Sequence, residues 1–349
     1  MISTKAYAAQ SATTPLAPFQ FERREPGAHD VQIEILYCGV CHSDIHQVRN
    51  EWGGSMYPMI PGHEIVGRVI STGNQVTKFK TGDLAGVGCF VDSCRECENC
   101  KQSLEQYCDA GMTGTYNGRE RKTGAPTYGG YSTQIVVDEN YTLCVSDKLP
   151  LAGVAPLLCA GITTYSPLRY TQVGKGHKVA VLGLGGLGHM AVKFAVSFGA
   201  EVTMLSSSAS KQADAEKLGA HHFALTSDAK TMNRLKNSFD FIINTISAQH
   251  DYGTYLQLLR TNGTMIVLGV PPVPSAVPAF NLIGKRRSII GSLIGGIKET
   301  QEMLDYCAAH NIVSEVEVIK ASEINEAYER MIKGDVRYRF VIDINSIRG

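Results

Sequence analysis

Two groups of cysteine and histidine residues could bind metal ions in this chain. The first is dense: residues 92–108 read DSCRECENCKQSLEQYC, with the spacing C-x2-C-x2-C-x7-C. Its four cysteines are Cys94, Cys97, Cys100 and Cys108. Four thiolates can fill a tetrahedral zinc site, although a redox centre or a disulfide knot would use the same residue type. The N-terminus, MISTKAYAAQ, lacks the apolar core of a secretory signal, so we expect a cytoplasmic protein with reduced thiols, which favours metal over disulfides.

The second group is scattered along the chain. Cys41 lies in CGVCHSDIH, His63 and Glu64 lie in PGHEIVG, and Cys159 lies in PLLCAGITTY. A catalytic zinc needs three protein ligands and one open position, which Cys41, His63 and Cys159 could provide. Spacing alone does not show that three distant residues converge, and scattered cysteines are usually structural.

A glycine-rich segment could bind phosphate. The sequence GLGGLG (183–188) matches G-x-G-x-x-G and follows HKVAVLG, a buried-strand pattern. Apolar residues then recur on one helical face from Leu187 to Phe198, and Gly199 stands where a C-cap is expected. The N–H groups of a helix N-terminus bind pyrophosphate. We therefore predict a dinucleotide site at Gly183, Gly185, Gly186, Leu187 and Gly188.

The next predicted strand, EVTMLS, indicates which dinucleotide binds. An NAD site usually has Asp or Glu at the end of this strand, where it binds the ribose 2′-OH. Here the strand runs into LSSSASK, so the neutral residues Ser206, Ser207 and Ser208 stand there with Lys211 close behind. Hydroxyls and an ammonium group suit a 2′-phosphate, so we predict NADP(H). The alternative is a serine helix cap, at Ser208 or Ser210, with a solvated lysine.

The surrounding elements fall into two patterns. Before about residue 150, strand-like runs such as DVQIEILYCGV and HEIVGRVIS alternate with Gly and Pro turns, which is typical of a β-rich domain. After about residue 155, strands alternate with helices, among them the helix expected over residues 209–220, and this predicts a doubly wound parallel sheet. RRSIIGSLIGG is expected to be its last strand. The fold class is therefore α/β with an additional β-rich domain.

Charge and hydropathy exclude other classes. Lys and Arg together number 33 and Asp and Glu together number 33, so nothing indicates a nucleic-acid-binding surface or an electrostatic membrane anchor. No apolar stretch reaches the ~18 residues that a membrane-spanning helix needs. We expect neither a nucleic-acid partner nor a membrane partner.

Taken together, these motifs resemble the zinc-dependent medium-chain alcohol dehydrogenases. The resemblance covers essentially the whole chain and is carried by CGVCHSDIH, PGHEIVGRV, the four-cysteine run, LLCAGITTYSPL, GLGGLGH and GSLIGG. The chain most resembles the cinnamyl-alcohol-dehydrogenase branch and its bacterial aldehyde reductases. This resemblance is carried by HSD followed by EWG and YP, and by the SSS at the end of the second predicted strand. The resemblance implies a GroES-like catalytic domain (1–154 and 294–349) and a Rossmann cofactor domain (155–293).

The resemblance also implies roles for individual residues. Cys41, His63 and Cys159 would bind a catalytic zinc, which Glu64 approaches, and Asp44 would orient the histidine. The dense cysteine run would hold a second, structural zinc with no open position. Ser43 and His46 would relay a proton. The remaining implied contacts are His42, Thr163 and Arg339 to the cofactor, and Trp52, Phe90 and Ile294 to the substrate.

The function that follows is zinc- and NADP(H)-dependent hydride transfer between the nicotinamide and a zinc-bound primary alcohol or aldehyde, with a broad range that includes aryl and cinnamyl-type substrates. A polyol or amino-alcohol dehydrogenase of the same superfamily is the first alternative. A non-catalytic module that binds zinc and a nucleotide is the second, and it would hold one zinc instead of two. The family further implies a homo-oligomer, with a dimer through an edge strand near residues 286–296 favoured over a tetramer.

Overall fold

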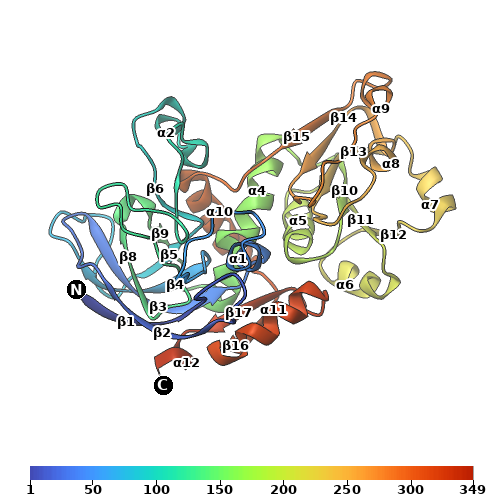
Figure 1. Cartoon of the computed structure of the whole chain (residues 1–349). Coiled ribbons are helices and arrows are strands. Elements are labelled where there is room, and N and C mark those ends of the chain that lie inside the picture. The colour runs from blue at the N-terminus through green and yellow to red at the C-terminus, as the bar shows by residue number, and fades with distance from the viewer. Residues whose placement is uncertain (349) are drawn as a thin grey trace. The chain divides into compact units, whose positions relative to one another are not determined.

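The computed structural model describes residues 1–348 (Figure 1). The chain forms two compact units, one made of residues 1–162 with residues 295 onward, the other of Thr163–Ile294. We call them the β-rich unit and the α/β unit. The division falls inside helix α4 (Ala160–Tyr170), a little beyond the boundary at 154 that the sequence predicts.

The β-rich unit is built from short strands with helices at its C-terminal end. Its elements are β1 (Ile2–Ala8), β2 (Ala17–Arg23), β3 (Asp30–Gly39), α1 (His42–Val48), β4 (Ile65–Thr72), β5 (Leu84–Val87), β6 (Phe90–Asp92), α2 (Glu98–Lys101), η1 (Glu105–Tyr107), β7 (Thr113–Gly114), β8 (Gln134–Asp138), η2 (Glu139–Tyr141), β9 (Leu143–Cys144), α3 (Leu151–Val154), η3 (Ala155–Leu158), α10 (Ile297–His310), β16 (Val316–Lys320), η5 (Ala321–Glu323), α11 (Ile324–Ile332), β17 (Arg339–Asp343) and α12 (Asn345–Arg348).

Strand β3 is at the centre of the main sheet of this unit. The strand order is β16-β17-β3-β4-β5-β9, and β8 also pairs with β3. Apolar residues alternate along β3, so Val31, Ile33 and Ile35 all point into the core and are fully buried. The C-terminal strand β17 pairs antiparallel with the end of β3. This pairing brings residues near 340 next to the segment that leads into Cys41.

The α/β unit alternates strands and helices as the sequence predicts. Its elements, after α4, are β10 (Lys178–Leu182), α5 (Gly186–Ser197), β11 (Glu201–Ser206), η4 (Ala209–Lys211), α6 (Gln212–Lys217), β12 (His222–Leu225), α7 (Ala229–Arg234), β13 (Phe239–Asn244), α8 (Tyr252–Leu256), β14 (Leu259–Val267), α9 (Ala279–Ile283) and β15 (Ser288–Gly291). The strands pair in parallel in the order β12-β11-β10-β13-β14-β15. The order reverses between β10 and β13, and ligands bind at such a switch point.

The predicted elements of this unit are confirmed with two differences. The last strand, expected in RRSIIGSLIGG, is confined to Ser288–Gly291, and the second difference concerns a helix. The glycine expected as a C-cap, Gly199, follows α5 with φ +86°, the left-handed conformation that suits glycine. The helix expected over 209–220 is shorter, because its first turn is the 3-10 helix η4 and α6 ends at Lys217. The Ser208 side chain does not cap it and instead contacts the hydroxyl of Ser210 at 2.8 Å.

Within residues 1–348, no single helix has the length and apolar composition needed to cross a membrane. One bent pair, Leu151–Leu158 with Ala160–Tyr170, meets that criterion only when its two parts are taken together. Most of its side chains are buried, including Leu157, Leu158 and Ile162.

Candidate active site

Cys41, His63 and Cys159 converge in the β-rich unit. Cys41 precedes α1, His63 lies just before β4, and Cys159 follows η3. The ligand atoms of these three residues and of Glu64 all lie within 4.8 Å of one another, and all four residues are buried. The sulfur atoms of Cys41 and Cys159 are 3.9 Å apart. The fold thus brings together the scattered residues that spacing alone could not place.

Asp44 fixes the orientation of His63. The carboxylate is fully buried and accepts hydrogen bonds from the backbone N–H groups of Cys41 (2.9 Å) and Gly62 (3.1 Å). It also pairs with Nδ1 of His63 at 3.1 Å. An imidazole held at Nδ1 presents Nε2 to a metal. Two thiols and an oriented imidazole form the donor set of a catalytic zinc, so these residues fit the metal that the sequence predicts.

Glu64 and Arg339 form a buried pair beside this cluster. Arg339 donates to one oxygen of Glu64, whereas the other oxygen, Oε2, has no hydrogen-bond partner. A buried carboxylate oxygen without a donor, next to two thiols, fits a cation in the cluster. Burial raises the pKa of Glu64 to about 7, although the guanidinium acts in the opposite direction. Arg339 is itself buried against Glu64, and its contact to a pyrophosphate stays a prediction.

The two thiols of the cluster differ in acidity. Their shared hydrogen bond lowers the pKa of Cys41 well below its ordinary value and raises that of Cys159. The nearby imidazole of His63 also lowers the pKa of Cys41. Cysteine binds zinc as a thiolate. Of the two thiolates that a zinc ion would require, the surroundings therefore already favour the one at Cys41.

Helix α1 carries the residues predicted to move a proton. Ser43 lies 3.6 Å from the Cys41 sulfur, measured from its Oγ. His46, one helical turn further on, contacts Oε2 of Glu51 through Nδ1 at 2.5 Å, and the ring of Trp52 stacks on it at 4.8 Å. The sequence analysis missed Glu51, although a carboxylate five residues after a candidate relay histidine was a usable signal. His42 is exposed on the same helix.

The predicted substrate-pocket residues lie in different surroundings. Trp52 is half-exposed beside His46. Phe90 is buried and packs edge-on against Tyr141, so it contributes to the core of the β-rich unit. Ile294 belongs to the α/β unit. Neither unit gathers these three side chains by itself, and a pocket shared by them stays a prediction.

Two further side chains contact the cluster. The Cys89 thiol donates to the Leu158 carbonyl oxygen at 3.7 Å and helps to raise the pKa of Cys159. The ring of Tyr116 stacks on His63 with centroids 5.8 Å apart. Neither residue lies in a motif that the sequence analysis uses. Only the fold brings the loop after β5 and the loop after β7 to this cluster.

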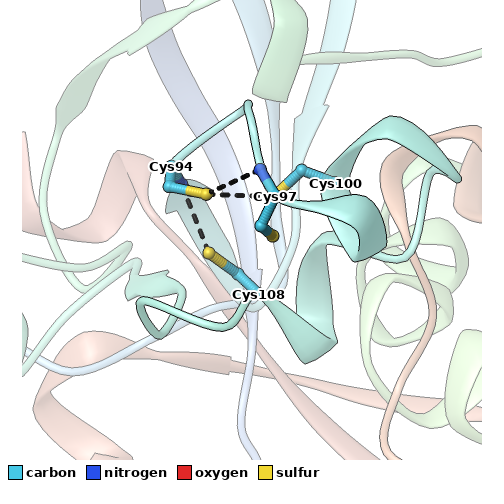
Figure 2. A group of neighbouring side chains, drawn as sticks. All are labelled: Cys94, Cys97, Cys100 and Cys108. Atoms are coloured by element: carbon cyan, nitrogen blue, oxygen red, sulfur yellow. Dashed lines mark hydrogen bonds between the residues drawn. The ribbon is translucent and has the colours of Figure 1, made fainter.

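The dense cysteine run forms a second cluster, shown in Figure 2. The sulfur atoms of Cys94, Cys97, Cys100 and Cys108 all lie within 4.8 Å of one another. The backbone N–H groups of Cys94 and Cys97 each donate to a cysteine sulfur at 3.3 Å. Such donors stabilise thiolates. All ten cysteines are free in this structure, and four thiolates suit a closed tetrahedral zinc site.

The glycine-rich turn lies at the switch point of the parallel sheet. Gly183 has φ +92°, and a Cβ on Gly188 would lie 1.9 Å from the Gly183 carbonyl oxygen. Both positions therefore require glycine for the fold itself. A Cβ on Gly185 would meet no atom within 4 Å, so its missing side chain is explained by the approach of a ligand. This open cradle fits a dinucleotide pyrophosphate.

Thr245 holds this turn in place. Its hydroxyl donates to the carbonyl oxygens of Leu182 (2.9 Å) and Gly183 (3.1 Å). The sequence analysis missed this residue, although its place after β13, next to the switch point, could have identified it. Thr163, predicted to contact the nicotinamide, is buried in α4.

The end of strand β11 carries no carboxylate. The buried hydroxyl of Ser206 accepts from the Ser208 N–H at 3.2 Å, whereas Ser207 is exposed. Lys211 reaches back to the glycine-rich turn, where its ammonium group donates to the Leu184 carbonyl at 2.6 Å. The structure therefore gathers the predicted serines and lysine at one end of the cradle.

Comparisons with known proteins agree with both halves of this description. Residues 27–147 match the alcohol dehydrogenase GroES-like domain, and residues 186–309 match the zinc-binding dehydrogenase family. NADP-dependent alcohol dehydrogenase C 1 of Mycolicibacterium smegmatis is 58% identical over 349 residues, the whole of both chains. Aldehyde reductase YahK of Escherichia coli is 57% identical over 341 residues, 97% of each chain.

A solved structure extends the likeness to the fold. The cinnamyl alcohol dehydrogenase of Helicobacter pylori, complexed with NADP(H), is 46% identical, with a TM-score of 0.93 over 99% of both chains. The family matches, the NADP-dependent relative and the NADP(H) complex all agree with a zinc enzyme that uses NADP(H). The chain therefore belongs to the zinc-dependent medium-chain alcohol dehydrogenases, in their cinnamyl-alcohol-dehydrogenase-like branch.

Proposed function

We propose that this chain is an NADP(H)- and zinc-dependent aldehyde reductase and alcohol dehydrogenase with a broad range that includes aryl and cinnamyl-type substrates. The reaction is RCHO + NADPH + H⁺ → RCH₂OH + NADP⁺. The observation that carries the proposal is the convergence of Cys41, His63 and Cys159, because a Cys2His set leaves one zinc position open for substrate. The close relatives named as NADP-dependent alcohol dehydrogenases and an aldehyde reductase support it.

Each metal has its own set of residues. Cys41, His63 and Cys159 would hold the catalytic zinc, with Glu64 and Asp44 behind them, and the four-cysteine loop would hold a structural zinc. When bound, zinc would supply Lewis acidity toward the carbonyl oxygen, and NADPH would supply the hydride. Two thiolates and a neutral imidazole would offset the charge of a divalent cation held by these three ligands.

We assign the transfer of the proton that the alcohol product gains to residues of α1. The Ser43 hydroxyl would pass it toward His46, because an imidazole can both accept and donate a proton, as the solvent end of a relay requires. Glu51 holds Nδ1 of His46 and thereby leaves Nε2 for proton exchange. Glu51→Gln should lower kcat roughly tenfold, which is less than the roughly 10²- to 10⁴-fold contribution of an acid–base group itself, because Glu51 only orients the imidazole. Unchanged kcat would exclude Glu51 from this role.

The cofactor preference is assigned to the end of β11. A hydrogen bond to a charged group contributes about 1.5–3 kcal/mol, so Ser207→Asp should shift the NADPH/NADH ratio of kcat/KM by about 10- to 100-fold toward NADH. Ser207→Asn is the matched control, since it has the same size without the charge. A parent enzyme that already prefers NADH would contradict this assignment.

The test of the whole proposal is a turnover screen of cinnamaldehyde, benzaldehyde, sorbitol and threonine with NADPH and NADH side by side. We expect aldehyde reduction with NADPH to be fastest. Cys159→Ser should abolish it, whereas Cys307→Ser, at a buried cysteine outside both clusters, should not. A protein that binds zinc and NADPH without any turnover would overturn the proposal.

Assembly is proposed to be a homodimer through strand β15. This strand is an edge of the six-stranded sheet, and an unpaired edge is a template for pairing with a second copy. Exposed apolar side chains stand in the preceding segment, among them Val270, Phe280 and Ile283. Ile290→Pro should convert a dimer into monomers in sedimentation analysis, and an unchanged dimer or a tetramer would argue against β15.

The expected cytoplasmic location is likewise a proposal, which cell fractionation would test.

A further inference from the structure

A chain of buried hydroxyl groups leads away from Asp44. Tyr131 is fully buried, and its hydroxyl donates to Oδ2 of Asp44 at 3.2 Å. Tyr328, from helix α11, donates to the Tyr131 hydroxyl at 3.4 Å. We infer that Tyr131 is a positioning residue for the metal ligand His63 and acts through Asp44, with Tyr328 in support. The inference rests on the zinc site proposed above.

The charge of Asp44 is the reason that one hydroxyl matters. The carboxylate is 0% exposed, and its donors are the backbone N–H groups of Cys41 and Gly62, the His63 imidazole and the Tyr131 hydroxyl. A buried charge is tolerated only when it is fully hydrogen-bonded. Without the Tyr131 hydroxyl, Oδ2 of the carboxylate would lose a donor, and the carboxylate would rotate toward its remaining donors. That rotation changes the position of the oxygen that Asp44 offers to Nδ1 of His63.

The backbone around Tyr131 is locked to the turn that carries His63. The N–H groups of Gly130 and Tyr131 donate to the carbonyls of Gly62 (2.9 Å) and Pro61 (3.0 Å). Gly62 has φ +101°, and a Cβ there would lie 2.7 Å from the Tyr131 ring. The absence of a side chain at Gly62 thus permits the close approach of the ring. Because the ring is fixed on this side, Phe at position 131 keeps the packing and removes only the hydroxyl.

Tyr131→Phe therefore tests the inference. Residues that orient a metal ligand change metal affinity by about 10- to 100-fold, so we expect zinc at the three-ligand site to bind about 10-fold more weakly, measured by competition with a chromophoric chelator. Zinc in the four-cysteine loop should bind as in the parent. With cobalt(II) in the three-ligand site, the d–d absorption bands should shift, because the imidazole changes its orientation.

Tyr141→Phe is the matched control. Tyr141 is equally buried in the same unit, but its hydroxyl contacts Ser93 beside the other cluster. The Tyr141→Phe variant should be less stable than the parent. Its three-ligand site should keep the zinc affinity and the cobalt spectrum of the parent. If Tyr131→Phe does the same, Tyr131 is merely structural and the inference is wrong.

A second variant keeps the test decisive if Tyr131→Phe does not fold. Tyr328→Phe removes the outer hydroxyl and should weaken zinc binding at the three-ligand site by about threefold, as expected for one neutral hydrogen bond. Unchanged affinity in that variant would overturn the inference. Both measurements use zinc and cobalt ions alone and need no enzyme activity. They therefore test the role of Tyr131 even if the parent protein reduces no aldehyde. A parent without activity would contradict the proposed function and not this inference.

Discussion

The two thiol clusters of this chain are built in opposite ways. All four sulfur atoms of the cysteine loop come from residues 94–108, whereas Cys41, His63 and Cys159 come from three separate segments. A closed set of four thiolates has no position for substrate, and three ligands leave one. We therefore propose that the ligands close in sequence stabilise the local structure and that the distant ones take part in the chemistry.

The largest expected effect comes from the dispersed site. Cys159→Ser should lower kcat/KM by at least about 10³-fold, because Lewis acidity supplies several kcal/mol and each 1.4 kcal/mol is a factor of ten. Metal analysis should show one zinc lost and one retained, with little change in Tm. Loss of both zincs together would show that the two clusters are not independent.

The corresponding change in the cysteine loop should affect stability first. Cys100→Ser removes one of four thiolates, and the loss of a structural metal is among the largest single-residue effects, about 3 kcal/mol. In a chain of this size we expect Tm to fall by roughly 5–10 °C. Turnover per folded molecule, measured well below Tm, should stay within about twofold of the parent. A selective loss of kcat at unchanged Tm would reverse the comparison.

A smaller effect should follow from the side chain that supports Cys100. The Ser93 hydroxyl lies 3.1 Å from the Cys100 sulfur and 2.7 Å from the Tyr141 hydroxyl. Ser93→Ala should weaken zinc in the cysteine loop by about tenfold, at the lower end for residues behind a metal ligand, and should not alter aldehyde reduction. Zinc release to a chelator at constant temperature measures this. If zinc instead bound more weakly at the three-ligand site, the two clusters would be coupled.

The same contrast explains what could be predicted from the sequence. The cysteine loop and the glycine-rich turn are local, since the spacing of Cys94 to Cys108 and the place of Gly183 after a strand are visible in one short stretch. The convergence of Cys41, His63 and Cys159 depends on the β-sheet, so only the family resemblance predicted it. Tyr131 and Tyr116 could not be found, because their contacts to Asp44 and His63 join segments far apart in sequence.

The smallest effect should come from the exposed side of the cysteine loop. Arg95 pairs with Asp92 and Asp138, each at 2.9 Å, and its guanidinium lies 4.9 Å from the ring centre of Tyr141. The arginine side chain is 42% exposed, so water and salt screen these pairs. Exposed ion pairs contribute about 0–1 kcal/mol. The loop is therefore held by its metal and its sulfur contacts far more than by its surface charges.

Arg95→Gln should accordingly lower Tm by no more than about 3 °C, with zinc content and kcat unchanged. The difference from the parent should shrink when NaCl is raised from 50 mM to about 1 M, where the Debye length is about 3 Å. Arg68→Gln, at an exposed arginine whose hydrogen bond goes to the Gly82 carbonyl, controls for the loss of a surface charge. A fall in Tm as large as that of Cys100→Ser would mean that surface ion pairs, and not the four thiolates, hold the loop. The local cluster would then depend on long-range contacts as the catalytic one does.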